Sequence, residues 1–367
     1  MQKLKSVLVG MGGIANAHVD AARSHSDRLD LVAAMDVDEA KGRAFCDEFG
    51  IERFYGDFSR MIEAEKPDLV QIAAPPQFHC DLAVQSMEAG AWVFCEKPLC
   101  ASLAELDRIE AAERKTGNFC ATVFQMRYGP SNRHIKAVID SGAAGRMLVG
   151  LCHTLWFRDS EYYEVPWRGT WASELGGATM GQGIHGMDQF LELMGDWEEV
   201  TAMAGTLDRE IEVEDVSMAL VRFSSGAIGS IINSVLSPRQ VSAIRLDLQK
   251  ATIELNHLYH FNKGDWSITP APGEEDTAGV KALSEWPEDA EASHEIQLGA
   301  VLDDRSAGRR PLTSGPGARE TLSFVASLYK SVFTGELVRK GSIGPGDPFY
   351  DGMNGGRSRL PDRSVVS

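Results

Sequence analysis

The sequence predicts an α/β protein of two domains, in which a doubly wound parallel sheet is followed by an α+β domain with a large, mostly antiparallel open sheet. The first third of the chain alternates short apolar segments with segments of helical periodicity. From about Arg146 onward, strand-like segments follow one another directly. The length of 367 residues favours two domains. We expect residues 1–125 to form the first domain and residues 126–367 the second.

The first domain is expected to contain six strands with helices between them. We expect strands at 4–10, 29–35, 53–55, 69–74, 92–95 and 119–124, and helices at 14–24, 39–49, 58–65, 78–89 and 103–116. Alternating strands and helices imply right-handed crossovers and helices on both faces of a parallel sheet. Ligands bind beyond the carboxyl ends of such strands, so the residues after each strand are candidates for function.

The second domain shows a different pattern, with strand-like segments predominating. We expect strands at 147–157, 217–223, 227–234, 243–248 and 251–255, and a helix at 187–194. The stretch from Pro270 to Glu288 is acidic and rich in alanine, glycine and proline. It is therefore expected to be a loop with little packed structure.

Composition excludes several classes of function. The net charge of −17 argues against nucleic acid and anionic membranes, because both require a basic face. No apolar run approaches the roughly 18 residues that span a bilayer, and Met1 to Lys5 lead straight into the first strand. We therefore expect no signal peptide and a cytoplasmic protein. The six cysteines form no Cys-x-x-Cys pair, which predicts buried thiols and no metal site.

A glycine-rich turn joins the first strand to the first helix. Gly10 permits the turn, and Gly12 has no side chain to obstruct a pyrophosphate. Gly13 and Ile14 then lead into the helix, and the small Ala15 allows close packing on the strand. The amino end of a helix offers unpaired N–H groups and a positive dipole to phosphates. The alternative is an ordinary glycine turn, but the context favours dinucleotide binding.

A carboxylate at the end of the second strand supports that interpretation. Asp36 follows Ala15 by 21 residues, close to the spacing of about 20 that is typical of the carboxylate that binds an adenosine ribose. Since Val37 and Asp38 follow it without a basic residue, a 2′-phosphate would be repelled. The expected cofactor is NAD.

Further polar residues follow the fourth and fifth strands. Ala74 and Pro75 precede His79, which either forms a wall of the cofactor site or only caps or packs the next helix. Glu96 and Lys97 stand directly behind the fifth strand, where they form either a surface ion pair or part of a site. A lysine at the cofactor end of the sheet could hold a substrate hydroxyl or move its proton.

Weaker candidates lie elsewhere. Beside the cofactor we place Gln125, Trp167 and Arg168, and near the substrate we place Arg127, Tyr128, His153 and Gln182. A solvated arginine is the alternative for Arg127, and filling of the core is the alternative for His153. Dense glycines ahead of His185 indicate a backbone that passes close to another group. His185 is a candidate acid or base, or it only caps the helix from Met187.

The glycine turn, the Glu96-Lys97-Pro98 motif and the glycine-rich approach to His185 together resemble the Gfo/Idh/MocA family of nicotinamide-dependent oxidoreductases. The resemblance runs from Leu4 to about Gly335. It implies a Rossmann domain, a second domain with an open sheet that pairs with another subunit, and sugars or polyols as substrates. It also implies that Lys97 contacts the reacting hydroxyl and that His185 acts as acid or base.

Two positions depart from the family pattern. Gly181 stands where many family dehydrogenases have an aspartate, four positions before the histidine. Gln182 could substitute as a hydrogen-bonding group, although it cannot titrate. Pro76 stands where many relatives carry asparagine. The proton path is therefore expected to differ from that of inositol dehydrogenase.

We therefore predict an NAD-dependent dehydrogenase or reductase acting on a secondary alcohol or ketone of a sugar, anhydrosugar or polyol, assembled as a homodimer or homotetramer. Catalysis is assigned to Lys97 and His185. Three alternatives stay open: a glycosidase that uses bound NAD for transient oxidation, a non-catalytic nucleotide sensor, and a reductase that works with NADPH.

Overall fold

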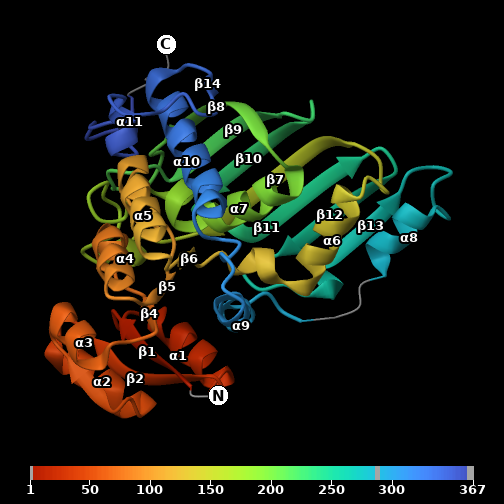
Figure 1. Cartoon of the computed structure of the whole chain (residues 1–367). Helices are drawn as coiled ribbons and strands as arrows, with labels where there is room; N and C mark the ends of the chain where they lie inside the picture. The colour runs from red at the N-terminus through yellow and green to blue at the C-terminus, as the bar shows by residue number, and fades with distance from the viewer. Residues whose placement is uncertain (1–2, 286–289, 362–367) are drawn as a thin grey trace. The chain divides into compact units, whose positions relative to one another are not determined.

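The computed structural model describes residues 3–285 and 290–361, and it divides the chain into two compact units (Figure 1). The first unit comprises Met1–Gln125 and Ser293–Glu320, and the second comprises Met126–Ala292 and Thr321–Ser367. The fold class expected from the sequence is confirmed. The segment 293–320 was expected in the second domain, but it returns to the first unit.

The first unit is built on a parallel sheet of six strands in the order β3-β2-β1-β4-β5-β6. The strands are β1 (Leu4–Val9), β2 (Leu29–Met35), β3 (Arg53–Tyr55), β4 (Leu69–Ile72), β5 (Trp92–Cys95) and β6 (Cys120–Thr122). From β1 the strands continue through β2 to β3 on one side of the sheet, and from β4 they continue through β5 to β6 on the other. Since parallel crossovers are right-handed, the helices fall on both faces, and the loops after β1 and β4 diverge at a switch point that suits a ligand.

The helices of this sheet begin and end where the sequence provides caps. They are α1 (Ala15–Ser24), α2 (Glu39–Phe49), α3 (Phe58–Glu65), α4 (His79–Glu88) and α5 (Leu103–Thr116), with a 3₁₀ turn, η1 (Pro76–Phe78), before α4. The side chains of Asp38, Asp57 and Ser102 cap the amino ends of α2, α3 and α5. Gly50 and Gly117 end α2 and α5 in the left-handed conformation.

Helix α9 (His294–Ser306) explains the return of the later segment to the first unit. Its Leu298, Val301 and Leu302 are fully buried in an apolar cluster with Ala21 of α1 and Phe94 of β5. Burying three aliphatic side chains contributes roughly 1.5–3 kcal/mol each. This association joins segments that lie far apart in the chain, such as Leu298 with Phe94 and with Ala21, so local sequence patterns do not report it.

The second unit contains an eight-stranded sheet in the order β13-β12-β11-β7-β10-β9-β8-β14. Its strands are β7 (Met147–Phe157), β8 (Trp197–Gly205), β9 (Val216–Phe223), β10 (Ile228–Ser234), β11 (Leu236–Leu248), β12 (Ala251–His257), β13 (Trp266–Pro270) and β14 (Val338–Arg339). All neighbouring pairs in this order are antiparallel except β7 with β10.

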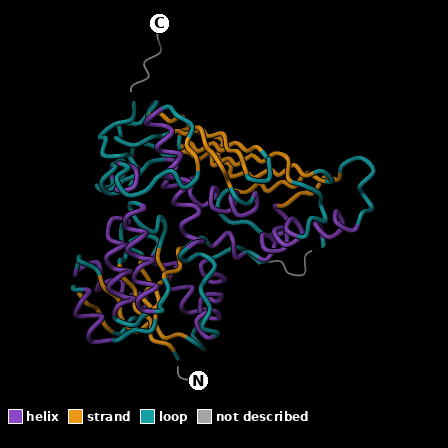
Figure 2. Tube along the Cα trace, turned by 45° about the horizontal axis from the view of Figure 1, so that its top comes forward, coloured by secondary structure: helices purple, strands orange, loops and turns teal. Residues whose placement is uncertain are grey.

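Helices cover one face of this sheet (Figure 2). The helices of this part of the chain are α6 (Pro130–Asp140), α7 (Ile184–Met194), α8 (Ala278–Ser284), α10 (Pro316–Thr334), which begins in the first unit, and α11 (Pro348–Asp351). The short turns are η2 (Gln125–Tyr128), η3 (Glu161–Glu164), η5 (Lys263–Asp265) and a π-helical turn, η4 (Ala178–Gly183). Along β8, β9 and β10, buried and exposed residues alternate. Met203, Met218, Leu220 and Ile228 are exposed apolar side chains on these strands.

One expectation for the second unit was wrong. Within the stretch from Pro270 to Glu288, expected to be a loop, residues 278–284 form α8; residues 286–289 lie outside the described part. Val280 and Leu283 are buried one turn apart, and a side chain at Gly279 would meet the Ala143 carbonyl oxygen at 2.0 Å. The glycine that favoured a loop thus allows close helix packing.

In the described ranges, no helix is long and apolar enough to cross a membrane.

Candidate active site

The loop after β1 has the shape expected of a phosphate-binding turn. Gly10 has a φ of +86°, and a side chain there would meet the backbone of Ala74 at 2.6 Å. Only glycine fits at this approach of the β1 and β4 loops. By contrast, a Cβ at Gly12 or Gly13 would meet no atom within 4 Å. Ile14 then lies at the N-cap of α1 with no side-chain cap. The open space beside an uncapped helix terminus fits a pyrophosphate.

Asp36 ties the end of β2 to this glycine loop. Its Oδ2 accepts a hydrogen bond from the Met11 N–H at 2.8 Å, and its Oδ1 accepts one from the Asp38 N–H at 3.0 Å. Each carboxylate oxygen has a second lone pair, so ribose hydroxyls could still donate to both. The geometry fits a dinucleotide, with the pyrophosphate at Gly12 and Gly13 and the adenosine ribose at Asp36.

His79 holds the loops after β4 and β5 together. Its ring is fully buried, with Nδ1 2.8 Å from the Pro98 carbonyl oxygen and Nε2 2.7 Å from the Ala74 carbonyl oxygen. Burial lowers the pKa of His79, and the two carbonyl groups partly oppose this effect. The His79 side chain therefore stabilises the backbone of the loops that follow β4 and β5. The full burial of the ring favours the packing alternative for His79, and contact with a cofactor stays a prediction. Ala74 and Pro75 are partly accessible.

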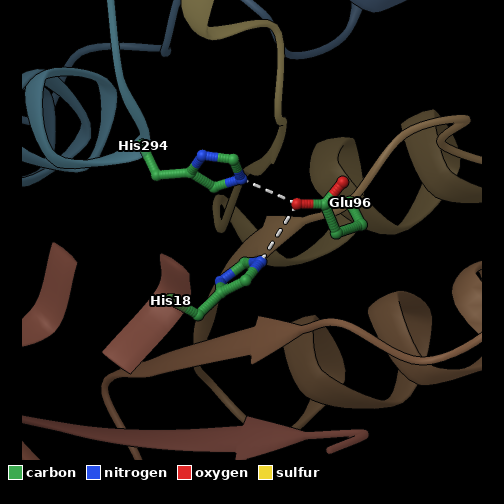
Figure 3. A group of neighbouring side chains, drawn as sticks. All are labelled: His18, Glu96 and His294. Atoms are coloured by element: carbon green, nitrogen blue, oxygen red, sulfur yellow. Dashed lines mark hydrogen bonds and ion pairs between the residues drawn. The ribbon is translucent and has the colours of Figure 1, made fainter. Parts of the chain in front are cut away.

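Glu96 is the centre of a buried polar cluster in the first unit (Figure 3). Its Oε1 accepts from His294 Nε2 at 2.8 Å and from His18 Nε2 at 3.3 Å. The Nδ1 atom of His18 lies 3.2 Å from Gln71 Oε1. Burial opposes ionisation of Glu96, but the two imidazoles outweigh it and hold its pKa well below the usual range. Histidine and glutamate are metal-binding residue types, and the ligand atoms of His18, Glu96 and His294 lie within 4.8 Å of one another; in the structure they form a hydrogen-bonded cluster.

Lys97 follows this cluster at the end of β5. Its backbone N–H donates to Glu96 Oε2 at 3.2 Å, and its side chain is partly accessible. The charged Glu96 and the bond from His79 to Pro98 thus fix the backbone on both sides of Lys97. A surface ion pair between Glu96 and Lys97, the alternative from the sequence, does not fit a carboxylate that is only 6% exposed.

Helix α7 places His185 in the second unit. The helix begins at Ile184, so His185 lies within its first turn and does not cap it. His185 lines a small cavity together with His153, Gln182, Trp156, Ser242 and His257. Burial lowers the pKa of His153 and brings that of His257 to about 4. A histidine cluster of this kind, enclosed but reachable from a cavity, can exchange protons with a hydroxyl group.

Arg127 holds α7 in place. Its Nε donates to Asp188 Oδ2 at 2.7 Å and its Nη2 donates to Asp188 Oδ1 at 2.5 Å, while Thr321 Oγ1 lies 3.2 Å from Nη2. Both members of this bidentate pair are buried, so Arg127 is not the solvated arginine that the sequence left open. The neighbouring Tyr128 and Gln125 are also buried. Substrate contact by Arg127 and Tyr128 stays a prediction, and so does cofactor contact by Gln125.

Trp167 and Arg168 belong to a polar network beside the cavity. The Arg168 guanidinium lies 3.8 Å from the ring centre of Tyr162 and 4.3 Å from that of Trp167. It also donates to the Tyr162 hydroxyl and, at 3.1 Å, to Glu174 Oε1. These contacts lie within the second unit, and a cofactor role for Trp167 and Arg168 stays a prediction.

Sequence reasoning missed His18, His294, Asp188 and Glu174. His18 lies one turn after Ala15 on the first helix, and Asp188 lies one turn after His185 on α7. These two could have been found from their spacing. His294 and Glu174 could not, because their partners lie far along the chain or in an irregular loop.

Comparison with known proteins agrees with this geometry. Residues 4–124 match the model of an oxidoreductase family with an NAD-binding Rossmann fold, and residues 132–254 match the GFO/IDH/MocA C-terminal domain. A myo-inositol 2-dehydrogenase of Thermotoga maritima is 31% identical over 62% of this chain and 67% of its own length. The chain belongs to the Gfo/Idh/MocA family of oxidoreductases.

Two further relatives of the Gfo/Idh/MocA family match nearly the whole chain. A D-apiose dehydrogenase of Paraburkholderia graminis is 27% identical over 98% of this chain and 96% of its own length. The WlbA dehydrogenase of Bordetella pertussis, solved with NADH and UDP-GlcNAcA, superposes with a TM-score of 0.82 at 27% identity, covering 92% of this chain and 98% of that one. The protein is therefore a nicotinamide-dependent oxidoreductase whose first unit is the dinucleotide-binding domain.

Proposed function

We propose that the protein oxidises a secondary alcohol of a sugar, anhydrosugar or polyol with NAD, or reduces the corresponding ketone with NADH. The observation that carries this proposal is the open glycine loop at the sheet's switch point with Asp36 beside it. The relatives named for D-apiose, for myo-inositol and for WlbA with its bound UDP-sugar support a carbohydrate substrate. NAD, when bound, would supply the hydride chemistry.

The preference for NAD over NADP rests on Asp36. Its carboxylate can accept from the ribose hydroxyls, and it would repel a 2′-phosphate. Val37 behind it is 87% exposed and offers no positive charge, and Arg43 of α2 is already bonded to Glu39. An NADPH-dependent reductase is the less favoured alternative.

Lys97 and His185 each supply one group to the reaction. Lys97 donates a hydrogen bond to the reacting oxygen and stabilises negative charge that develops on it. His185 takes up the hydroxyl proton on oxidation, because a histidine with a reference pKa of roughly 6.5 is suited to this task near neutral pH. Gln182 and His153 line the same cavity as His185. In this proposal they bind further hydroxyls of the substrate.

Assembly through the open face of the eight-stranded sheet belongs to the same proposal. Four apolar side chains on β8, β9 and β10 are exposed, with Leu220 63% and Met203 62% accessible. Exposed apolar side chains gathered on one face are typical of an interface. A homodimer or homotetramer that buries this face is expected, and Leu220→Glu should shift the mass measured by light scattering towards the monomer.

The test of function is a panel of monosaccharides, anhydrosugars and inositols assayed with NAD and NADP. We expect NADH formation with at least one compound, faster with NAD than with NADP, and loss of turnover in Lys97→Ala. Cleavage of a glycoside without net NADH would favour the NAD-requiring glycosidase. NAD binding without turnover on any compound would favour a nucleotide sensor and contradict the proposal.

A further inference from the structure

A buried carboxylate, Glu174, belongs to the polar network that leads to the small cavity beside His185, and it has no assigned function. Glu174 is only 5% exposed. Its Oε2 accepts from the Gly169 N–H at 2.6 Å, and its Oε1 accepts from Arg168 Nη1 at 3.1 Å. Burial raises the pKa of Glu174, and the two donors partly oppose this effect. A carboxylate held in this way costs desolvation energy, which calls for a reason beyond packing.

The second observation is at Gly181, in the π-helical turn that leads into α7. A Cβ built on Gly181 would meet a single group within 4 Å, the Oε1 atom of Glu174 at 3.5 Å. The carboxyl oxygens of a short acidic side chain at 181 would lie within about 2.4 Å of such a Cβ, from standard covalent dimensions. The Glu174 carboxylate therefore adjoins the space that an acidic side chain at position 181 would occupy.

A chain of hydrogen bonds connects Glu174 to the cavity. Arg168, bound to Glu174, also donates to the Tyr162 hydroxyl. The same hydroxyl accepts from Gln182 Nε2 at 3.0 Å. Gln182 lines the cavity that contains His185. Because its amide nitrogen is committed to Tyr162, the amide presents its carbonyl oxygen as the acceptor for a substrate hydroxyl.

We propose that Glu174 is a positioning residue of the substrate site, which supplies from the preceding loop the carboxylate that position 181 lacks. Its negative charge holds Arg168, and through Tyr162 it fixes the orientation of Gln182 beside His185. The inference rests on the proposed function, since it assigns a role in the same site. It also explains how Gly181, the departure from the family pattern, is compatible with a working acid–base site.

The test moves the carboxylate. Glu174→Gln should lower kcat/KM about tenfold to a hundredfold, the range typical of residues that orient active-site groups, with the Kd for NAD unchanged. Loss of this negative charge should also move the acid limb of the pH profile of kcat to lower pH.

Gly181→Asp alone places two carboxylates in contact and should lower the Tm. The double variant Gly181→Asp/Glu174→Gln should recover most of kcat/KM and the wild-type pH profile.

Glu113→Gln is the matched control, because Glu113 is also buried and accepts from an arginine, Arg310, and from a backbone N–H, that of Cys120. It should lower the Tm without moving the pH profile. Full turnover and an unchanged pH profile in Glu174→Gln would overturn the inference, as would a folded double variant no better than Glu174→Gln. Absence of turnover in the wild type would instead overturn the proposed function.

Discussion

Glu96 and Glu174 are both buried glutamates, one in each unit, and they differ in the donors that surround them. Glu96 receives two imidazole N–H groups on one oxygen, and its pKa lies well below the usual range. Glu174 receives one guanidinium and one backbone N–H, and burial raises its pKa. Equal burial thus gives opposite shifts, because the charge and number of donors decide whether desolvation is overcome.

The difference extends to the regions around the two residues. In the first unit, Glu96 keeps its negative charge next to Lys97 in the sequence, and the His79 ring lies against the carbonyl oxygens of Ala74 and Pro98. On the side of His185, burial dominates: it lowers the pKa of His153 and raises that of Glu192 to about 7. Around His185, several groups have pKa values moved towards neutral forms, whereas Glu96 is held in its charged form.

The largest expected effect is on turnover, at His185. His185→Ala should lower kcat by about 10² to 10⁴, the usual contribution of a general acid or base, and leave the Kd for NAD nearly unchanged. Steady-state kinetics and calorimetric titration of NAD measure the two quantities. If His185→Asn kept full kcat and lost only thermal stability, the acid–base assignment of His185 would be withdrawn.

The next effect separates the two glutamates by stability. Glu96→Gln leaves imidazoles without their anion and should cost about 3 kcal/mol at pH 7. Since the folded pKa of Glu96 is depressed, this advantage of the wild type is present above the unfolded pKa of roughly 4.3 and is lost as pH falls through the folded pKa.

For Glu174→Gln we expect the stability difference between wild type and variant to change with pH in the opposite direction. A raised folded pKa makes the wild type relatively most stable below the unfolded pKa of roughly 4.3, and this advantage is lost as pH rises through the folded pKa. Urea unfolding of both variants from pH 3 to 8 measures the slopes. If the free energy of unfolding, relative to wild type, changed with pH in the same direction for both variants, the contrast between Glu96 and Glu174 would be wrong.

A third effect tests the open glycine loop. Gly12→Val adds methyl groups where no protein atom lies within 4 Å, so the fold should survive while the phosphates are displaced. We expect the Kd for NAD to rise more than about tenfold, or at least about 1.4 kcal/mol. Gly56→Val, at another glycine with no atom within 4 Å, is the control and should bind NAD normally. Unchanged affinity in Gly12→Val would show that the phosphate loop is wrongly assigned.

The smallest effect concerns cofactor choice. Asp36→Ala removes the carboxylate that faces the ribose and should weaken NAD binding while NADP improves, narrowing the ratio of the two kcat/KM values. Because Asp36 also accepts from the Met11 N–H, a small loss of stability is expected as well. Comparable efficiency of the wild type with NADP would refute the NAD preference.

The same contrast between the units describes what the sequence could predict. In the first unit the strands, the turn at Gly10 and the carboxylate at Asp36 follow one another locally, and they are found within one or two residues of their expected places. The partners of Glu96 lie 78 and 198 residues away, and no local period reports such pairs. The return of α9 to the first unit was missed for the same reason. Strand β8 was missed although buried residues alternate along it.

In the second unit the sequence located the residues and missed their surroundings. His185, His153 and Gln182 do line one cavity. The ion pair of Arg127 with Asp188, and the approach of Glu174 to Gly181, depend on side-chain directions that spacing alone does not give. Charged residues in irregular loops remain ambiguous until their donors are known, and for this reason Arg127 had a solvated alternative.

Lys97 offers the most direct test of the central claim, which is that the first unit binds NAD and supplies a catalytic lysine. In Lys97→Ala, NAD binding by calorimetry and NADH formation in a single turnover are measured on the same preparation. The account predicts an unchanged Kd for NAD and a rate of NADH formation lower by about 10² to 10⁴. NADH formation at the wild-type rate, or loss of NAD binding with the fold intact, would contradict it.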